Sequence, residues 1–456
     1  MNGNDRSILG LTGLGHGLVH AHELSIPILL GLWMVEFGVG SAIMGAIVAA
    51  GYACYGIGAV PAGVLTDAFG STALLVACLL GMGGSFLLLA LAPGPIVLGV
   101  ALVCWGSAAS IYHPAGLRLI STGVTERGTG FAYHGIAGNL GIAVGPLLTA
   151  MALLVLEWRA VVGLLAIPAL LAAGYAALVS VDETAAVSDR APEPDRTSVS
   201  DSASESERVP ESSDEATGAD DGAFGGADTD GGDPSGSGTG SGGTERPSIA
   251  DVLTDTRVLF AGGFLLVFPI VVLEGFFYRG VLTFLPDVLA DEAALGSLSL
   301  GSRALDPAEF VYTGLLFVGM AGQYVGGRLT DRMSPERPLV GAFAALVVLS
   351  VAFVPALQAG LAPLVAVSFL LGFVLFGEQP LLQAVVADYS GSDVRGLSYG
   401  YMFLGVFGVG SLGAAVSGAV LAYGTHQVLF LVLALVPLLA AAGTTVLVGR
   451  RRQPVE

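Results

Sequence analysis

Long apolar runs recur along almost the whole chain, and they restrict its fold more than any other feature. A helix needs about 20 apolar residues to cross the core of a bilayer, and runs of this length alternate here with short polar or Gly/Pro-rich breaks. The mean hydropathy of +0.77 is too high for a soluble protein of 456 residues. We therefore predict an all-α membrane protein with twelve transmembrane helices. They cover residues 8–34, 40–66, 72–92, 95–119, 128–156, 159–181, 258–288, 307–330, 338–358, 362–387, 396–423 and 427–449.

One segment interrupts this pattern. Residues 182–247 contain 17 acidic residues and 4 arginines, which gives −13 of the net charge of −19. With almost nothing to bury, the segment is predicted to be a disordered cytoplasmic linker. The predicted domains are a six-helix bundle at residues 1–181, the linker at 182–250 and a second six-helix bundle at 251–456. Acidic residues without any lysine also indicate a host with a high-salt cytoplasm, such as a haloarchaeon.

The arginines predict the orientation in the membrane. Most of those outside the linker fall at helix ends or loops on the side where both termini lie, whereas only Arg159 and Arg303 fall on the other side. Positive residues are enriched on the cytoplasmic side of membrane proteins. We predict a multi-pass protein of the plasma membrane with both termini in the cytoplasm.

The two halves share sequence motifs. Gly63-Val-Leu-Thr-Asp67 matches Gly327-Arg-Leu-Thr-Asp331 with an offset of 264, and His113-Pro114 corresponds to Gln379-Pro380 with an offset of 266. Two matches at nearly the same offset indicate a duplicated six-helix unit. Duplicated bundles that rock about a central site are typical of secondary transporters.

These features resemble the major facilitator superfamily over the whole chain apart from the linker. The segments "IPILLGLW", "ASIYHPAG", "RGTGFAYHGIAGNLGIAVGP" and "GVLTFLP" are similar to the fosmidomycin-resistance-like branch, whose members export drugs or small organic compounds. The resemblance implies two pseudo-symmetric six-helix bundles and transport by alternating access.

The resemblance also implies a gating role for the loop motif, in which the Asp pairs across the bundle interface. The first copy departs from the family pattern, because Asp67 is followed by Ala68 instead of a basic residue. The alternative is that Asp67 only caps a helix. The residues of the two copies are Gly63, Asp67, Gly70, Gly327, Arg328, Asp331 and Arg332.

The predicted fifth helix carries a stripe of small residues. His134, Gly138, Gly141 and Gly145 step by 4, 3 and 4 residues and therefore share one face, which ends at Pro146. Such a stripe permits close helix packing. It also resembles the antiporter motif of the superfamily, which implies exchange and so favours export.

Four titratable groups lie in the first predicted helix. His16, His20 and Glu23 share one face, whereas His22 points away from it. Ionisable residues within a span are costly and are functional candidates by default, although they also pair for packing alone. We expect Glu23 and His20 to exchange protons near neutral pH. We expect no metal site, because a second ligand cluster is not evident and the HExxH pattern fails at Ile26.

Further polar groups fall in helices that line the cavity in this family. Arg279 needs an anionic partner, for which Glu23 and an anionic substrate are the candidates. The full set of predicted coupling or cavity residues is His16, His20, Glu23, His113, His134, Asn139, Glu274, Tyr278, Arg279, Glu378, Gln379 and Gln383.

The sequence therefore predicts a proton-coupled exporter of small organic compounds that acts as a monomer without a cofactor. The alternatives are an uptake symporter and a sodium-coupled exporter. The sequence has no nucleophile with a base, no metal motif and no nucleotide loop, which argues against an enzyme. It also lacks an exposed basic patch for binding nucleic acid.

Overall fold

The computed structural model describes residues 1–188, 249–291, 298–300, 303–305, 307–391 and 395–451, and almost all of them are helical. The first half contains α1 (Gly3–Phe37), α2 (Ser41–Ile57), α3 (Ala59–Phe69), α4 (Ser71–Ala90), α5 (Pro95–Ala109), α6 (Tyr112–Gly123), α7 (Arg127–Leu153), α8 (Trp158–Leu178) and α9 (Ala185–Ser188). The second half contains α10 (Ile249–Ala261), α11 (Phe264–Ala290), α12 (Pro307–Thr330), α13 (Glu336–Ala359), α14 (Leu361–Asp388), α15 (Arg395–Phe403), the π-helix η3 (Leu404–Val409), α16 (Leu412–Tyr423) and α17 (His426–Arg451). A short antiparallel pair, β1 (Leu298–Leu300) and β2 (Arg303–Leu305), precedes α12.

Eleven helical segments of the described chain are long and apolar enough to cross a membrane. Two of these spans consist of two helices each, because α2 gives way to α3 at Gly58 and α5 gives way to α6 at Ser110. The predicted eighth span corresponds to α12, which has 24 residues but is not among the eleven. Its five glycines, together with Glu309 and Gln323, make it less apolar.

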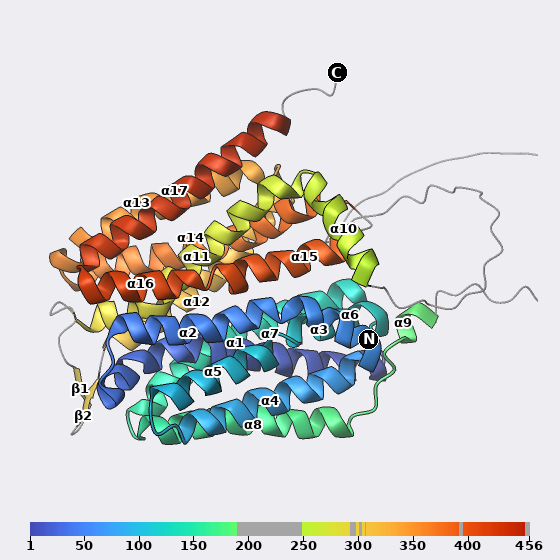
Figure 1. Ribbon diagram of the computed structural model, residues 1–456, viewed down its shortest axis with the longest axis horizontal. Coiled ribbons are helices and arrows are strands. Elements are labelled where there is room, and N and C mark those ends of the chain that lie inside the picture. The colour runs from blue at the N-terminus through green and yellow to red at the C-terminus, as the bar shows by residue number, and fades with distance from the viewer. Residues whose placement is uncertain (189–248, 292–297, 301–302, 306, 392–394, 452–456) are drawn as a thin grey trace, which may run out of the picture.

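The helices form two bundles, each around its own hydrophobic core. The first half occupies the lower part of Figure 1 and the second half the upper part. The bundles meet where α2 packs against α16 and η3, α7 against α12, and α1 against α11. The fold class predicted from the sequence is confirmed by this all-helical architecture and its apolar spans.

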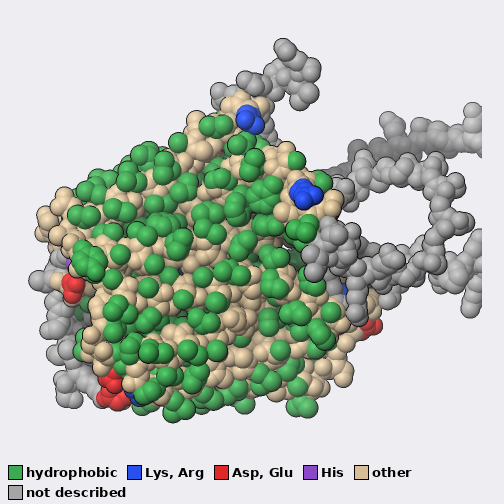
Figure 2. Space-filling view, viewed as in Figure 1, with side chains coloured by type: hydrophobic (Ala, Val, Ile, Leu, Met, Phe, Trp, Pro, Cys, Tyr) green, Lys and Arg blue, Asp and Glu red, His purple; other side chains and the backbone are tan. Residues whose placement is uncertain are grey.

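Side chains on the surface are arranged as a bilayer requires. Apolar side chains cover the middle of the face seen in Figure 2, whereas charged side chains gather toward the two ends of the bundle. Strongly exposed apolar residues include Ile96 and Leu171, which are 81% and 69% exposed. Surface of this kind is stable against lipid and not against water.

The chain just after the first predicted bundle contacts the N-terminus. Asn4 Nδ2 donates to the Asp182 carbonyl oxygen at 3.0 Å, and the Asp182 amide donates to Asn4 Oδ1 at 2.8 Å. Asp182, the first residue of the predicted linker, therefore contacts the start of α1. Residues 189–248 of the predicted linker lie outside the described residues.

Candidate functional site

A cavity of about 720 Å³ lies between the two halves. It reaches the part of the bundle where α7 begins and α12 ends, since Phe131 and Gly327 line it. This is the end that holds the N-terminus, because Met1 forms an ion pair with Glu126. Nine of the twelve predicted site residues line the cavity: His16, His20, His113, His134, Asn139, Glu274, Tyr278, Gln379 and Gln383.

The other three predicted residues, Glu23, Arg279 and Glu378, are buried and do not line the cavity. Glu23 on α1 and Arg279 on α11 form an ion pair that joins the two halves. Of the two partners considered for Arg279, the structure therefore provides Glu23. The guanidinium also lies over the Tyr52 ring, 3.8 Å from its centroid, and the Tyr52 hydroxyl donates to the Glu23 carbonyl oxygen at 3.1 Å.

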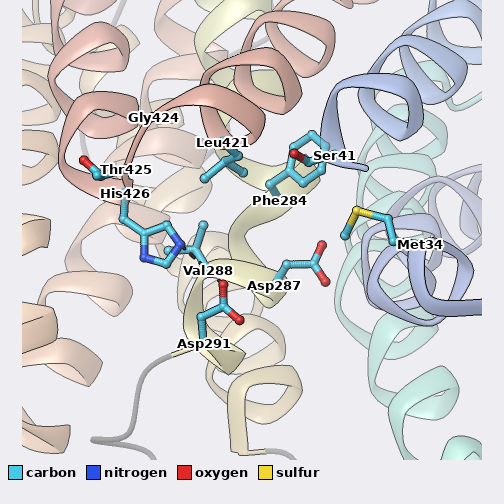
Figure 3. A pocket seen from close by; sticks show the side chains of 10 residues that line it. All are labelled: Met34, Ser41, Phe284, Asp287, Val288, Asp291, Leu421, Gly424, Thr425 and His426. Atoms are coloured by element: carbon cyan, nitrogen blue, oxygen red, sulfur yellow. Dashed lines mark ion pairs between the residues drawn. The ribbon is translucent and has the colours of Figure 1, made fainter. Parts of the chain in front are cut away.

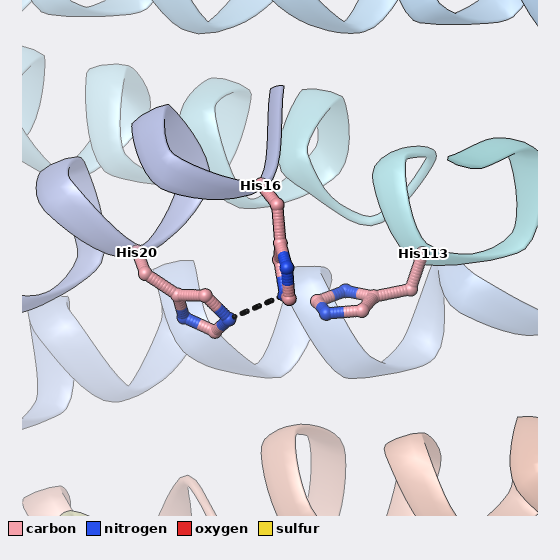
Figure 4. A group of neighbouring side chains, drawn as sticks. All are labelled: His16, His20 and His113. Atoms are coloured by element: carbon pink, nitrogen blue, oxygen red, sulfur yellow. Dashed lines mark hydrogen bonds between the residues drawn. The ribbon is translucent and has the colours of Figure 1, made fainter. Parts of the chain in front are cut away.

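Glu23 also contacts a cluster of histidines beside the cavity. Its Oε2 atom lies 2.7 Å from His20 Nδ1, and His20 Nε2 lies 3.1 Å from His16 Nε2. His16 stacks on His134 with 3.9 Å between ring centroids. His113 approaches the His16 ring edge-on (Figure 4), with 5.3 Å between the centroids. The predicted face of α1 thus meets histidines from α6 and α7.

His22 lies apart from this cluster. Its Nε2 atom is 2.9 Å from the Leu165 carbonyl oxygen of α8, and its ring stacks on Phe86 of α4 at 3.8 Å. The side chain packs inside the first bundle and does not line the cavity. It is therefore a suitable control for experiments on the other histidines.

A pair of carboxylates lies on the side of the cavity that the second half forms. Glu274 of α11 and Glu378 of α14 are 3% and 0% exposed, and their side chains lie close enough to interact with each other. Two like charges side by side away from water are costly, so the pair is suited to holding a proton. Nearby, Gln323 Nε2 donates to Gln379 Oε1 at 3.0 Å.

The glycine stripe of α7 packs directly on α1. A Cβ atom on Gly138 would overlap the His16 ring, one on Gly141 would overlap the Gly17 carbonyl, and one on Gly145 would overlap Ala21. Pro146 lies inside the same helix. The stripe therefore brings the α1 and α7 backbones into contact and places His16 against His134.

The first copy of the loop motif is stabilised by a residue that the sequence analysis missed. Glu183 accepts hydrogen bonds from the amides of Ser71 and Thr72 at 2.9 and 2.8 Å, at the start of α4. Burial raises the pKa of Glu183, but these hydrogen bonds and the nearby Arg118 guanidinium lower it by more, so the net pKa is lower than usual.

A glycine turn at Gly70 and a hydrogen bond from Arg118 to the Thr66 carbonyl oxygen also shape this first copy. Gly70 ends α3 at a φ of 86°, a conformation that favours glycine. Arg118 Nη1 donates to the Thr66 carbonyl oxygen at 2.6 Å. The Asp67 side chain is not among those that the structure describes. The space beside Gly63 is open, since a Cβ atom there would have no neighbour within 4 Å.

The second copy is more open. Arg328 lies over the Tyr324 ring at 5.4 Å. Asp331 and Arg332 are exposed, and neither makes a side-chain ion pair within the described part of the chain. Within the described residues, Asp331 therefore does not form the pairing across the bundle interface that the resemblance implies.

At the opposite end of the bundle, a smaller cavity of about 520 Å³ lies between the halves (Figure 3). His426 Nε2 lies 3.5 Å from Asp291 Oδ2 at its rim. Beside it, Ser41 Oγ donates to the Gly418 carbonyl oxygen at 3.0 Å, and the α2 and α16 backbones approach closely at Gly45 and Gly418. The contacts of Ser41 and Gly45 with α16 hold the halves together at this end.

Comparison with known proteins identifies the fold. The family model described as Major Facilitator Superfamily matches residues 12–413 and 307–456. A bacterial homolog of the human lysosomal transporter Spinster, inward-facing and unoccupied, has a TM-score of 0.68 at 12% identity, covering 98% of this chain and 97% of that one. A mutant of the nucleoside transporter NupG has a TM-score of 0.67 at 13% identity, covering 96% of this chain and 99% of that one. No curated protein matches the sequence.

Proposed function

The chain belongs to the Major Facilitator Superfamily of transporters, and from this premise we propose that it exports small organic compounds in exchange for protons. The observation that carries the proposal is the cavity of about 720 Å³ between the halves, beside an ion pair that links them. Rocking of the bundles about this cavity would expose it alternately to each side of the membrane.

The lining of the cavity supports an organic substrate. Its volume falls within the range of sites that hold drug-sized molecules. Phe403 and Phe407 offer aromatic faces, and Asn139, Gln379 and Gln383 offer amide groups for hydrogen bonds. This mixture agrees with the resemblance to the fosmidomycin-resistance-like branch.

Protons are the coupling ion that this site best accommodates. Glu274 lines the cavity and Glu378 lies buried beside it, so that a proton on the pair removes the repulsion between two carboxylates. The stripe of Gly138, Gly141 and Gly145 supports exchange over symport by its likeness to the antiporter motif. Uptake symport and sodium coupling are the alternatives, the latter favoured by a high-salt host.

The arginine distribution supports an orientation with both termini cytoplasmic. We propose that the protein lies in the plasma membrane and works as a monomer. In this orientation the described cavity faces the cytoplasm, which is the side from which an exporter takes up its substrate.

The test begins with a thermal-shift screen of small organic compounds on the purified protein. A stabilising compound is then measured in proteoliposomes with an imposed pH gradient, with an imposed sodium gradient and in counterflow without a gradient. We expect accumulation driven by protons and not by sodium. Accumulation that follows sodium at fixed pH, or substrate movement in the same direction as protons, would refute the proposal.

Variants locate the coupling site. Glu274→Gln and Glu378→Gln should abolish proton-driven accumulation and leave counterflow measurable, because amides cannot exchange protons. Glu157→Gln is the matched control, since Glu157 is an exposed carboxylate at the start of α8 with no side-chain capping bond. Normal proton-driven transport in both cavity variants would exclude this pair as the coupling site.

A further inference from the structure

The hydrogen bonds of the histidine cluster determine which ring nitrogens carry protons. His16 Nδ1 lies 2.8 Å from the His134 carbonyl oxygen, which accepts and cannot donate, so this nitrogen carries hydrogen. His20 Nδ1 lies 2.7 Å from Glu23 Oε2. Because Glu23 is ion-paired with Arg279, its carboxylate accepts as well. In both neutral rings the remaining nitrogen, Nε2, therefore presents a lone pair.

These two lone pairs face each other. His16 Nε2 and His20 Nε2 are separated by 3.1 Å, and two acceptors at this distance do not attract one another. The arrangement is favourable only with a cation between or beside them. That cation is either a proton on one of the rings or a metal ion bound by both.

A third imidazole makes the metal ion the better fit. The ligand atoms of His16, His20 and His113 all lie within 4.8 Å of one another. Zinc binds imidazole nitrogen at about 2.0–2.1 Å, so tetrahedral ligands lie about 3.3 Å apart, and His113 has to approach by at most about 1.5 Å. Its Nδ1 is 3.2 Å from the Tyr55 hydroxyl, and donation to that oxygen leaves Nε2 as a ligand.

We propose that His16, His20 and His113 bind a divalent transition-metal ion such as Zn²⁺, with the fourth position open to the cavity. Metal-binding histidines usually donate their other N–H to a carboxylate or a carbonyl, as His20 does to Glu23 and His16 to His134. The sequence alone predicts no metal site, because it shows no second ligand group. That group is His113, which α6 brings to the face of α1 that carries His16 and His20 (Figure 4).

Charge and ligand chemistry determine the class of ion. The charge of Arg279 is neutralised by Glu23, and Glu274 adds a carboxylate to the lining of the same cavity, so the described residues that line the cavity include no unbalanced positive group to repel a divalent cation. Imidazole nitrogens suit zinc, copper and nickel, whereas magnesium, calcium and sodium prefer oxygen ligands.

The experiment is a titration of the purified full-length protein, free of any affinity tag, with Zn²⁺ by calorimetry and with Co²⁺ by visible absorption. We expect one ion per chain and an absorption spectrum typical of tetrahedral cobalt. His16→Gln, His20→Gln and His113→Gln should each weaken binding at least about 100-fold. His22→Gln, which removes a fully buried histidine of α1 outside the cavity, should bind as the wild type does.

X-ray absorption on the zinc-loaded wild-type protein provides a measurement that needs no variant. Three imidazole nitrogens at about 2.0–2.1 Å would support the site. No binding by the wild type, a shell of oxygen ligands, or unchanged affinity in folded His113→Gln would overturn it, and the first of these would leave a proton between His16 and His20. Because no transport is measured, this result does not depend on the proposal of organic export.

Discussion

Replacement of Glu23 by Gln should open the end of the transporter that the structure holds closed. Glu23 and Arg279 are each about 1% exposed and join α1 to α11 across the two halves. The variant leaves Arg279 as a buried cation without its carboxylate partner in this conformation. In a conformation where the halves separate, water can solvate the same guanidinium.

The size of the shift follows from the burial. Removing one partner of a buried ion pair costs about 3–5 kcal/mol, while the Tyr52 ring, 3.8 Å from the guanidinium, remains as a partial partner. We therefore expect the lower end of this range, about 3 kcal/mol. At about 1.4 kcal/mol per factor of ten, this shifts the equilibrium between the conformations roughly 100-fold.

The assay is a distance measurement between spin labels in each half at that end. Val35 of α1 and Tyr423 of α16 are 86% and 90% exposed and accept labels after Val35→Cys and Tyr423→Cys substitution. The native cysteines, Cys54, Cys78 and Cys104, are replaced by alanine first. In Glu23→Gln the distance distribution should move to longer values.

Two further variants make the result decisive. Glu23→Gln combined with Arg279→Gln removes both charges and should return the distribution toward that of the wild type. His22→Gln on the same helix should leave the distribution unchanged. The reasoning is refuted if Glu23→Gln keeps the wild-type distribution, or if the double variant opens as far as the single one.

Three other perturbations test separate parts of the fold. Gly141→Ala should lower thermal stability by about 1–3 kcal/mol, because its Cβ overlaps the Gly17 carbonyl, whereas Gly135→Ala, with nothing nearby, should not; equal unfolding temperatures would contradict the packing. Asp331→Asn should slow transport in vesicles without changing the unfolding temperature, since Asp331 is exposed here and the resemblance implies that it pairs in another conformation; a lower unfolding temperature would argue against this. Glu183→Gln should cost about 1 kcal/mol as the loss of a helix cap. Because the folded pKa of Glu183 is lowered, its contribution is present above the unfolded pKa and disappears as pH falls through the folded pKa. Thermal unfolding of wild type and variant should converge there, and a difference that persists at low pH would contradict the assignment.

Features that depend on one helix were predictable from the sequence. The shared face of His16, His20 and Glu23 and the stripe of Gly138 and Gly141 follow from helical periodicity alone. In the structure the residues of each set do lie on one face of their helix. The α1 face lies beside the cavity, and the α7 stripe packs against α1.

Features that depend on two helices far apart in sequence were not predictable in the same way. The contact between Glu274 and Glu378 depends on how α11 and α14 are rotated about their axes, and pairing rules favour opposite charges over two carboxylates. Glu183 falls in the predicted linker because it follows Asp182 at the start of an acidic stretch. Only the three-dimensional position of α4 reveals that the Glu183 carboxylate accepts hydrogen bonds from the amides of Ser71 and Thr72.

The histidine cluster and the Glu23–Arg279 pair differ in what happens to them when the protein changes shape. His16, His113 and His134 lie on α1, α6 and α7, which all belong to the first half, and close glycine contacts join α1 to α7. In a rigid-body motion this half carries the whole cluster with it. An ion bound there keeps its ligands while the cluster is exposed first to one side of the membrane and then to the other. The Glu23–Arg279 pair spans both halves and has to separate if they part there, so one motion breaks this ion pair and leaves the histidine cluster intact.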